Sequence, residues 1–397
     1  MSYCLNIVGG GMVGASLALA LQSCAREAGW KIRLIEAHPP VSGGWQPSYD
    51  NRSTALSHGS RRLFERLGIW AELARRAEPI RHIHVSDRGH PGTARMDAER
   101  EGVPALGYIV ENAWLGEVLI GNLDHQAIEW LAPARVAHAR AQPGGYQLDL
   151  QVPDGTQQLA SDLLVIADGG RSGLLDQLGI HRKVSPYQQV AVIANVTTDK
   201  GHAGVAYERF TETGPLALLP LSGQRSALVW TLAVDVAQEV AALPDAAFLE
   251  RLQAAFGFRM GAMTRVGERA SYPLSLIEAE EQVRSHLVVL GNAAHSLHPI
   301  AGQGFNLSLR DAMALADALM RAQREGLHPG SLAVLQGYLD GQRGDQLATV
   351  AFSHYLTQMF SNQQPLLVAG RNMGLLAMDL LPPLKTRLAR QGMGLRG

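Results

Sequence analysis

The hydrophobic positions near the N-terminus change period twice within a short distance. Residues 4–8 form a brief apolar run, and a glycine-rich turn at residues 9–14 follows it. Apolar positions at residues 15–29 then recur with helical spacing, and residues 31–37 return to strand-like spacing. Because the period changes from strand to helix and back, this segment predicts a β-α-β unit.

Strand-like segments fill the middle of the chain. Residues 141–168 alternate apolar and polar positions on both sides of Asp154 and Gly155, a dipeptide that is typical of hairpin turns. Residues 188–269 contain several further alternating runs and one helical stretch at 245–256. We interpret the second region as a sheet inserted into the domain that the N-terminal unit begins.

The spacing is helical from Phe305 to the end, with interruptions at Pro365 and at the pair Pro382-Pro383. The longest apolar tract, residues 366–384, contains charged side chains such as Arg371. A membrane-spanning helix needs about 20 mostly apolar residues, so we do not expect this tract to cross a bilayer.

The composition adds limits on the class of protein. The chain has 397 residues, of which 46% are hydrophobic and 18% charged, enough for one large domain or two to three smaller ones. Lys and Arg number 35 against 36 Asp and Glu, which leaves a net charge of -1. This balance argues against nucleic acid as a partner, because a phosphate backbone attracts a strongly basic surface.

The N-terminus and the cysteines predict a cytoplasmic protein. The opening residues run directly into a strand and lack the basic flank and cleavage site of a signal peptide. Only Cys4 and Cys24 are present, and their spacing excludes a thiolate zinc site or a disulfide framework. Both thiols are expected to be buried.

The first glycine turn carries a dinucleotide-binding fingerprint, Gly9-x-Gly11-x-x-Gly14. In this motif the glycines permit a tight turn, close approach of the backbone to a pyrophosphate, and contact between helix and strand. Glu36 stands at the end of the second strand, where an acid can hold a ribose hydroxyl. Because an acid disfavours a 2′-phosphate at that position, FAD or NAD fits better than NADP.

In two later segments, an apolar run also ends at a pair of residues that contains glycine. One is LLVIADGGRSGLL, with Asp168-Gly169, and the other is LVVLGNAAHSLHPIAGQGFNLSLRDA, with Gly291-Asn292. Together with the N-terminal glycines, and in this order, these motifs resemble those of the FAD-dependent aromatic-ring monooxygenases of the para-hydroxybenzoate hydroxylase type. The resemblance covers nearly the whole chain and selects FAD over NAD.

The sequences of three segments show which branch of these monooxygenases the chain resembles. GNAAHSLHPIAGQGFNLSLRD, DNRSTALSHGSRRLFERLG and LPPLKTRLARQGMG are similar to segments of the ubiquinone-biosynthesis hydroxylases. The similarity is strongest to the members that hydroxylate 2-polyprenyl-6-methoxyphenol. Most flavin hydroxylases carry Gly-Asp where this chain has Gly291-Asn292, and the Asn is typical of this branch.

The resemblance implies an α/β fold with a Rossmann-like FAD-binding domain, an inserted β-sheet substrate domain and C-terminal helices. The FAD-binding domain is expected to be discontinuous, the substrate domain to consist of two segments, and the C-terminal helices to follow both. The FAD-binding domain is expected to comprise residues 1–75, 99–180 and 270–340. The substrate domain is expected to comprise residues 76–98 and 181–269, and the C-terminal helices residues 341–397.

The third motif is expected to seat the flavin. A helix beginning near Phe305, preceded by glycines, presents a positive dipole end to the negative charge of reduced flavin. Asn292 can accept a hydrogen bond from a ribityl hydroxyl, and Gly304 is expected to use a positive φ. The other cofactor-binding residues expected in this motif are Pro299, Gly302 and Asn306.

Four further residues have competing interpretations. Arg52 and Asn112 match positions where the family approaches the flavin, although a solvated loop Arg and a helix-capping Asn are the ordinary alternatives. His295 and His298 have the spacing of metal ligands, but no third ligand supports a metal site. We expect His298 to fix the loop with a hydrogen bond, and we predict no metal.

The resemblance also implies a reaction. A nicotinamide donor, NADH or NADPH, reduces FAD, O2 adds at flavin C4a, and the resulting hydroperoxide hydroxylates the ring of a polyprenylated phenol to give the 1,4-benzoquinol. The sequence does not name the base that deprotonates the phenol, so the catalytic residues are unassigned. Three alternatives remain open: hydroxylation at another ring position, a flavin oxidoreductase without oxygen insertion, and a non-catalytic flavin-binding subunit.

A polyprenyl substrate also suggests peripheral contact with a membrane or with other ubiquinone-biosynthesis proteins, and a homodimer stays open. The C-terminal leucines are the candidate contact, and the alternative is that they pack on the protein's own core. The residues of this candidate contact are Leu366, Leu367, Leu375, Leu376, Met378, Leu380 and Leu381.

Overall fold

The N-terminal β-α-β unit forms the centre of a six-stranded sheet. A computed structural model describes residues 3–39, 52–360, 364–380 and 382–395. β1 (Cys4–Val8) and β2 (Lys31–Ile35) run parallel and are joined by α1 (Met12–Ala28), as the change of period predicts. The strand order is β19-β20-β12-β1-β2-β8. The outer strands are β8 (Ile128–Leu131), β12 (Leu163–Ile166), β19 (Val283–Arg284) and β20 (Leu287–Val289).

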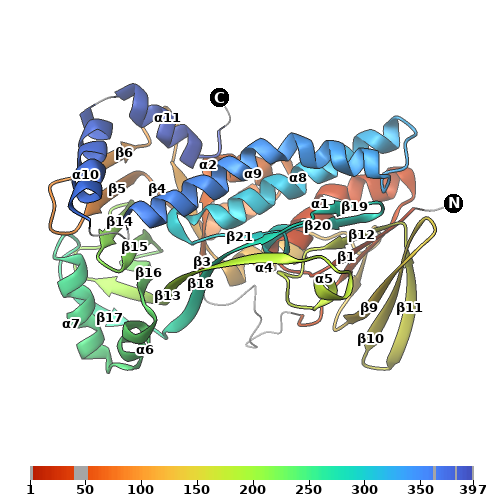
Figure 1. The fold of residues 1–397 in the computed structure, drawn as a ribbon, viewed down its shortest axis with the longest axis horizontal. Coiled ribbons are helices and arrows are strands. Elements are labelled where there is room, and N and C mark those ends of the chain that lie inside the picture. Colours follow the sequence, from red (N-terminus) through yellow and green to blue (C-terminus); the bar gives the residue numbers. More distant parts are fainter. Residues whose placement is uncertain (1–2, 40–51, 361–363, 381, 396–397) are drawn as a thin grey trace.

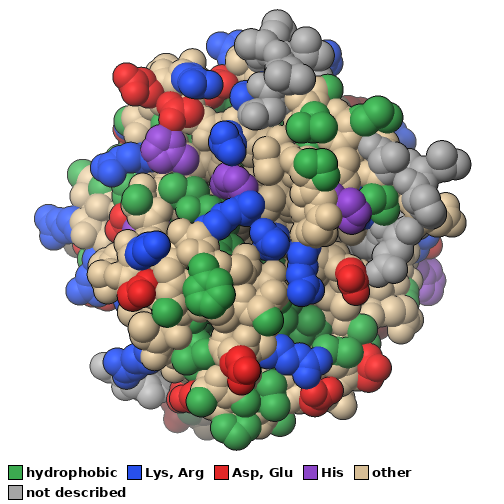
Figure 2. Space-filling view, turned by 90° about the vertical axis from the view of Figure 1, so that its left-hand side faces the viewer, with side chains coloured by type: hydrophobic (Ala, Val, Ile, Leu, Met, Phe, Trp, Pro, Cys, Tyr) green, Lys and Arg blue, Asp and Glu red, His purple; other side chains and the backbone are tan. Residues whose placement is uncertain are grey.

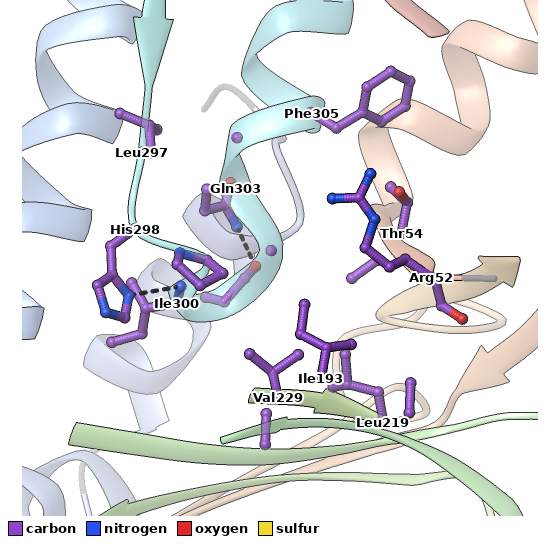
Figure 3. A pocket seen from close by; sticks show the side chains of 18 of the residues that line it. Arg52, Thr54, Ile193, Leu219, Val229, Leu297, His298, Ile300, Gln303 and Phe305 are labelled. Atoms are coloured by element: carbon purple, nitrogen blue, oxygen red, sulfur yellow. Dashed lines mark hydrogen bonds between the residues drawn. The ribbon is translucent and has the colours of Figure 1, made fainter. Parts of the chain in front are cut away.

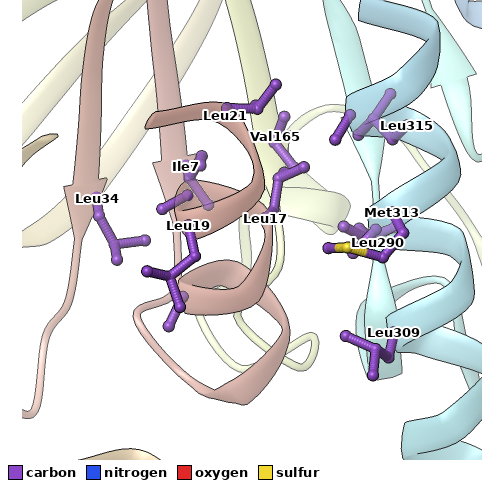
Figure 4. Close-up of a cluster of buried hydrophobic side chains, with 14 of the residues drawn as sticks. Ile7, Leu17, Leu19, Leu21, Leu34, Val165, Leu290, Leu309, Met313 and Leu315 are labelled. Atoms are coloured by element: carbon purple, nitrogen blue, oxygen red, sulfur yellow. The ribbon is translucent and has the colours of Figure 1, made fainter. Parts of the chain in front are cut away.

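Helices cover one face of this sheet and a small antiparallel sheet covers the other. On the first face, side chains of β1, α1, β12 and α8 (Gln303–Arg324) meet in one buried cluster (Figure 4), and α9 (Leu332–Phe360) packs on α8. The second face contacts the sheet of β9 (Arg135–Gln142), β10 (Gly145–Val152) and β11 (Gly155–Ser161). The predicted turn at Asp154 and Gly155 joins β10 to β11.

A nine-stranded sheet forms the other end of the molecule (Figure 1). The early strand β5, which lies in the expected segment 76–98, pairs in parallel with β14. The sheet also extends past residue 269, because β18 pairs with β13. Its members are β5 (His82–Asp87), β6 (Thr93–Asp97), β13 (Arg182–Thr198), β14 (Val205–Thr211), β15 (Gly214–Pro220), β16 (Arg225–Ala233), β17 (Met263–Val266), β18 (Ala270–Ala279) and β21 (His295–Ser296). Two helices, α6 (Val234–Ala242) and the predicted α7 (Asp245–Phe256), pack on it.

A three-stranded sheet and short helices complete the α/β body. The sheet consists of β3 (Ser53–Ser57), β7 (Gly107–Glu111) and β4 (Glu78–Ile80). The remaining short helices are α2 (His58–Arg66), α3 (Trp70–Leu73), α4 (Asn112–Gly121), α5 (Leu174–Gln177) and the 3-10 turns η1 (Ala74–Arg76), η2 (Gly291–Ala293) and η3 (Ile300–Gly302).

The C-terminal helices begin where the prolines predict. α10 (Pro365–Leu380) and α11 (Pro382–Gly392) each start at a proline, whose missing N–H has no partner to lose in the first helical turn. α10 is fastened to the end of β5 by a buried ion pair, in which Arg371 Nε lies 2.8 Å from Asp87 Oδ2. Asn372 donates to the same carboxylate.

Candidate active site

A cavity of about 1760 Å³ lies between the six-stranded and nine-stranded sheets. The parallel strands β1, β12 and β20 are neighbours, so the three motifs that follow them emerge at one edge of the sheet. On the opposite side, Ile193, Leu219 and Val229 point from the nine-stranded sheet into the cavity (Figure 3). Twelve of the predicted cofactor-binding residues line this space, namely Gly9, Gly11, Glu36, Arg52, Asn112, Asp168, Gly169, Asn292, Pro299, Gly302, Gly304 and Phe305.

The first glycine turn is too tight for side chains. Gly9 has φ +105°, and a Cβ there would lie 2.6 Å from the Ala167 carbonyl oxygen. A Cβ on Gly14 would collide with the Gly9 carbonyl oxygen, so Gly14 does not line the cavity but lets α1 approach β1. Gly11 is the N-cap of α1, and Gly11, Met12 and Val13 line the cavity, so the N-terminus of α1 lies where an anion site requires it.

Two carboxylates fix the loops at this edge. Glu36 accepts hydrogen bonds from the Gly10 and His38 backbone amides, each at 2.7 Å. Asp168 accepts from the amides of Gly170 and Ser172, each at 2.8 Å. A carboxylate has about four acceptor positions, so each side chain retains acceptor capacity toward the cavity while it shapes its loop.

The third motif departs from the predicted geometry at one glycine. Gly302 has φ +60°, and a Cβ there would lie 2.7 Å from Ala55 Cβ. Gly304 instead belongs to the first turn of α8 and has open space beside it. The prediction that Gly304 uses a positive φ is therefore wrong, because the chain has already entered the helix at Gln303.

Asn306 supports the third motif from behind instead of lining the cavity. Its Oδ1 accepts from the Ser57 amide at 2.8 Å and from the Ser60 hydroxyl at 2.7 Å. Its Nδ2 donates to the carbonyl oxygens of Ala55 and Gly302. This buried side chain thus ties the glycine loop to β3.

Arg52 and Asn112 lie next to each other. The backbone amide of Asn112 donates to the backbone carbonyl oxygen of Arg52 at 2.8 Å, and the Thr54 hydroxyl donates to Asn112 Oδ1 at 2.7 Å. The Arg52 guanidinium lies 4.8 Å from the centre of the Tyr272 ring, which belongs to the nine-stranded sheet. Arg52 therefore stands between the two sides of the cavity.

The two histidines of the third motif have different surroundings. His298 Nδ1 accepts from the Ile300 amide at 3.2 Å, so the predicted loop-fixing hydrogen bond is confirmed. Burial lowers the pKa of His298 to about 4, which keeps the ring neutral at pH 7. His295 instead pairs with buried Asp311 at 2.8 Å.

The opposite wall contains a residue that the sequence did not indicate. Glu208 of β14 lines the cavity among apolar side chains, and burial raises its pKa to about 7. A single acid within the alternating run VAYERF was the only signal, and alternation alone does not say which face of a strand meets a cavity.

Comparison with known proteins agrees with this architecture. Residues 3–332 match the FAD binding domain family. The p-nitrophenol 4-monooxygenase PnpA of Pseudomonas putida DLL-E4 has the same fold, with a TM-score of 0.81 and 20% identity over 100% of this chain and 98% of that one. The matched family and the fold define an FAD-dependent protein of this architecture.

Full-length relatives identify the branch of that class. Ubiquinone hydroxylase UbiL of Rhodospirillum rubrum is 37% identical, with 98% of this chain and 89% of the relative aligned. The 3-demethoxyubiquinol 3-hydroxylase of Escherichia coli strain K12 is 30% identical, with 98% of both chains aligned. The chain therefore belongs to the FAD-dependent ubiquinone-biosynthesis hydroxylase family.

Proposed function

We propose that this chain hydroxylates the ring of a polyprenylated phenol, converting 2-polyprenyl-6-methoxyphenol to the 1,4-benzoquinol in ubiquinone biosynthesis. One observation carries the proposal: the cavity continues from the glycine loop to apolar side chains of α9 and α10, including Leu356, Phe360 and Leu375. Its volume exceeds the roughly 300–1,000 Å³ of a site for one drug-sized ligand. A dinucleotide, a phenol ring and part of an apolar tail can share such a space.

The residues at the sheet edge fit FAD. We propose that the N-termini of α1 and α8 face its pyrophosphate and its flavin ring respectively, because both helix ends open on the cavity. Glu36 is proposed to hold the adenosine ribose, and Arg52, Asn112 and Asn292 to border the ribityl chain and flavin. When bound, FAD takes electrons from NADH or NADPH and uses O2 to supply the oxygen atom.

The protein's own part in the reaction is to orient the phenol and exclude water. We propose that residues 76–98 and 181–269 form the substrate domain and that residues 1–75, 99–180 and 270–340 hold the cofactor. β18, at the start of the last range, adds a strand to the sheet of the substrate domain. Residues 341–397 close the apolar end of the cavity in this proposal. Support comes from the apolar side chains that the nine-stranded sheet directs toward the glycine loop.

Product analysis tests the proposed reaction. The protein is reduced anaerobically with NADH or NADPH and then mixed with O2 and a short-chain polyprenyl phenol. The expected product carries one added oxygen on the ring. Flavin reduction without oxygen gain would indicate an oxidoreductase of another kind, and bound flavin that neither donor reduces would indicate a non-catalytic subunit.

We further propose that the chain meets its substrate at an anionic membrane surface. None of the helices within the described residues has the length and apolar character needed to cross a bilayer. Lys and Arg side chains gather in the middle of the face that carries α7 and α10, with hydrophobic side chains around them (Figure 2).

A cluster of arginines on and near β6 and β14 supports this docking surface. Arg95 and Arg209 alternate with cavity-lining neighbours on β6 and β14, so they point away from the cavity. Burial, then Arg259 and Arg88, lower the pKa of Arg209, which shows that its neighbours are mostly cations. Phe258, beside Arg259, is 70% exposed. Anionic lipid headgroups would relieve this repulsion while Phe258 enters the interface.

The structure describes the side chains of only two of the C-terminal residues predicted as the contact. Leu375 is buried and Leu376 is 39% exposed. The side chains of Leu366, Leu367, Met378 and Leu380, and residue Leu381, lie outside what the structure describes. Because Arg371 and Asn372 clamp α10 to Asp87, deleting this region would damage the fold, and point variants are the better test.

Sedimentation with vesicles tests the docking surface. Arg95→Glu/Arg259→Glu is expected to weaken binding to vesicles of phosphatidylglycerol and phosphatidylcholine about 10-fold or more, since each Arg near an anionic surface contributes about 1 kcal/mol. Arg62→Glu/Arg321→Glu, with the same change of charge on α2 and α8, is the control. Equal binding by the two double variants would contradict the proposal.

A further inference from the structure

The position of Glu208 on β14 places its carboxylate against the cavity. Its directly paired neighbours, Val85 on β5 and Ala217 on β15, also line the cavity, as do Ala206 and Phe210 on the same strand. Side chains two residues apart on a strand share a face. Glu208 is therefore the acidic position in an otherwise apolar patch of the sheet.

Contacts on either side bring this patch to the third glycine motif. Phe210 belongs to one buried cluster with Ile300, and Ala206 belongs to another cluster that contacts Ala55. Ala55 in turn lies against Gly302. Glu208 stands between these two contacts, so its carboxylate faces the part of the cavity next to the glycine loop.

The Glu208 carboxylate has no hydrogen-bond or ion-pair partner among the described residues. Burial in this apolar surrounding disfavours its charged form, and the pKa of Glu208 rises to about 7. A carboxylate that accepts no bond from the protein has all of its acceptor positions available to a ligand in the cavity.

Several other titratable side chains around the cavity are engaged or unsuited as bases. His298 is a neutral ring whose Nδ1 already accepts from the loop, and its low pKa makes it a weak base. The charged groups on the surrounding elements have their own contacts: Arg371 with Asp87, Arg225 with Glu111, Arg269 with Asp245, and Arg52 with the Tyr272 ring.

We propose that Glu208 is the catalytic base that accepts the proton of the substrate's phenol hydroxyl. This inference rests on the proposed hydroxylase function. The phenol O–H bond breaks, an O–H bond forms on Glu208, and the electron pair left on the phenolate oxygen makes the ring carbon nucleophilic. The ring carbon then bonds to a hydroxyl group that FAD and O2 supply, and the second oxygen atom of O2 leaves as water with the electrons of the nicotinamide donor. The ring C–H proton leaves to solvent, and Glu208 returns its proton to the phenolic oxygen.

The pH dependence of this step has a defined sign. Glu208 can accept a proton only when it is ionised, so hydroxylation should rise as pH increases through about 7 and then level off. Without the carboxylate, the rate should rise only toward the phenol's own pKa, about 10 for an unperturbed phenol such as tyrosine.

Single-turnover and steady-state measurements on the FAD-loaded enzyme with a short-chain polyprenyl phenol test the assignment. Glu208→Gln should lower kcat by at least about 100-fold, as for loss of a general base, with a much smaller change in KM. Reduction of the flavin by the nicotinamide donor should be unchanged. Glu212→Gln, at an exposed carboxylate just after β14 and outside the cavity lining, is the matched control and should keep the wild-type rate and pH profile.

A binding measurement gives a readout that does not depend on turnover. Wild-type protein should bind the phenol at least about 10-fold more tightly than its methyl ether, because only the phenol can donate a hydrogen bond to the charged acceptor. Glu208→Leu should bind the two equally. This preference should also weaken below pH 7 in the wild-type protein.

The outcomes separate the two proposals. Wild-type protein that forms no hydroxylated product overturns the hydroxylase function, and the role of Glu208 as its base with it. Wild-type protein that forms product while Glu208→Gln keeps its rate and pH profile overturns only the role of Glu208. Retained preference for the phenol in Glu208→Leu would also overturn that role.

Discussion

Gly14→Val is expected to abolish FAD uptake. A Cβ at this position would collide with the Gly9 carbonyl oxygen, and a branched side chain would also press on Ile7. The first turn of α1 would have to move away from β1, and the amides at the helix N-terminus would lose the geometry that an anion requires. Purification followed by flavin absorbance and protein concentration gives the FAD content per chain.

Gly121→Val provides the control for this change. Gly121 ends α4, and an added Cβ would meet nothing within 4 Å. This variant should retain wild-type FAD content, because it introduces the same side chain at a helical glycine with free space. A Gly14→Val protein that binds as much FAD as the control would refute the assignment of the N-terminal turn.

Gly302→Val is expected to damage the glycine loop itself, whereas Gly304→Val should affect only the cavity. A side chain at Gly302 must adopt φ +60° and overlap Ala55, and the left-handed conformation alone costs about 1–2 kcal/mol. The flavin-free Gly302→Val protein should therefore unfold at lower denaturant concentration. Any remaining NAD(P)H consumption should release hydrogen peroxide, because the loop no longer excludes water from the reacting centre.

Gly304 has helical geometry and open space, so Val there should leave the stability of the flavin-free protein within about 1 kcal/mol of wild type. The side chain would instead project into the cavity and lower FAD retention. Denaturation of both flavin-free proteins, FAD content, and the ratio of peroxide to hydroxylated product distinguish the two variants. Equal loss of stability in both would contradict the distinct roles of the two glycines.

Local chemistry allowed the sequence to predict which motifs follow the strands of the six-stranded sheet. Gly9, Asp168 and Asn292 each follow the end of an apolar run. Neighbouring parallel strands place their carboxyl ends at the same edge of the sheet, so these three residues lie near one another. The starts of α10 and α11 could also be predicted from the local sequence, because proline fixes where each helix can begin. These features depend on residue order over a few positions, and the sequence by itself determined them.

Contacts between distant segments were decided only by the tertiary structure. The expected substrate domain joined residues 76–98 to residues 181–269, but the sequence did not indicate which of their strands pair, here β5 with β14. Nor did it indicate that α8 begins at Gln303, so that Gly302 and not Gly304 takes the positive φ. The role proposed for Glu208 depends on the same level of structure, because an acid on an alternating strand faces either solvent or a cavity according to what packs over the sheet. Here the glycine loop packs over that face through Ile300 and Phe210, so the carboxylate faces the cavity and its pKa is raised.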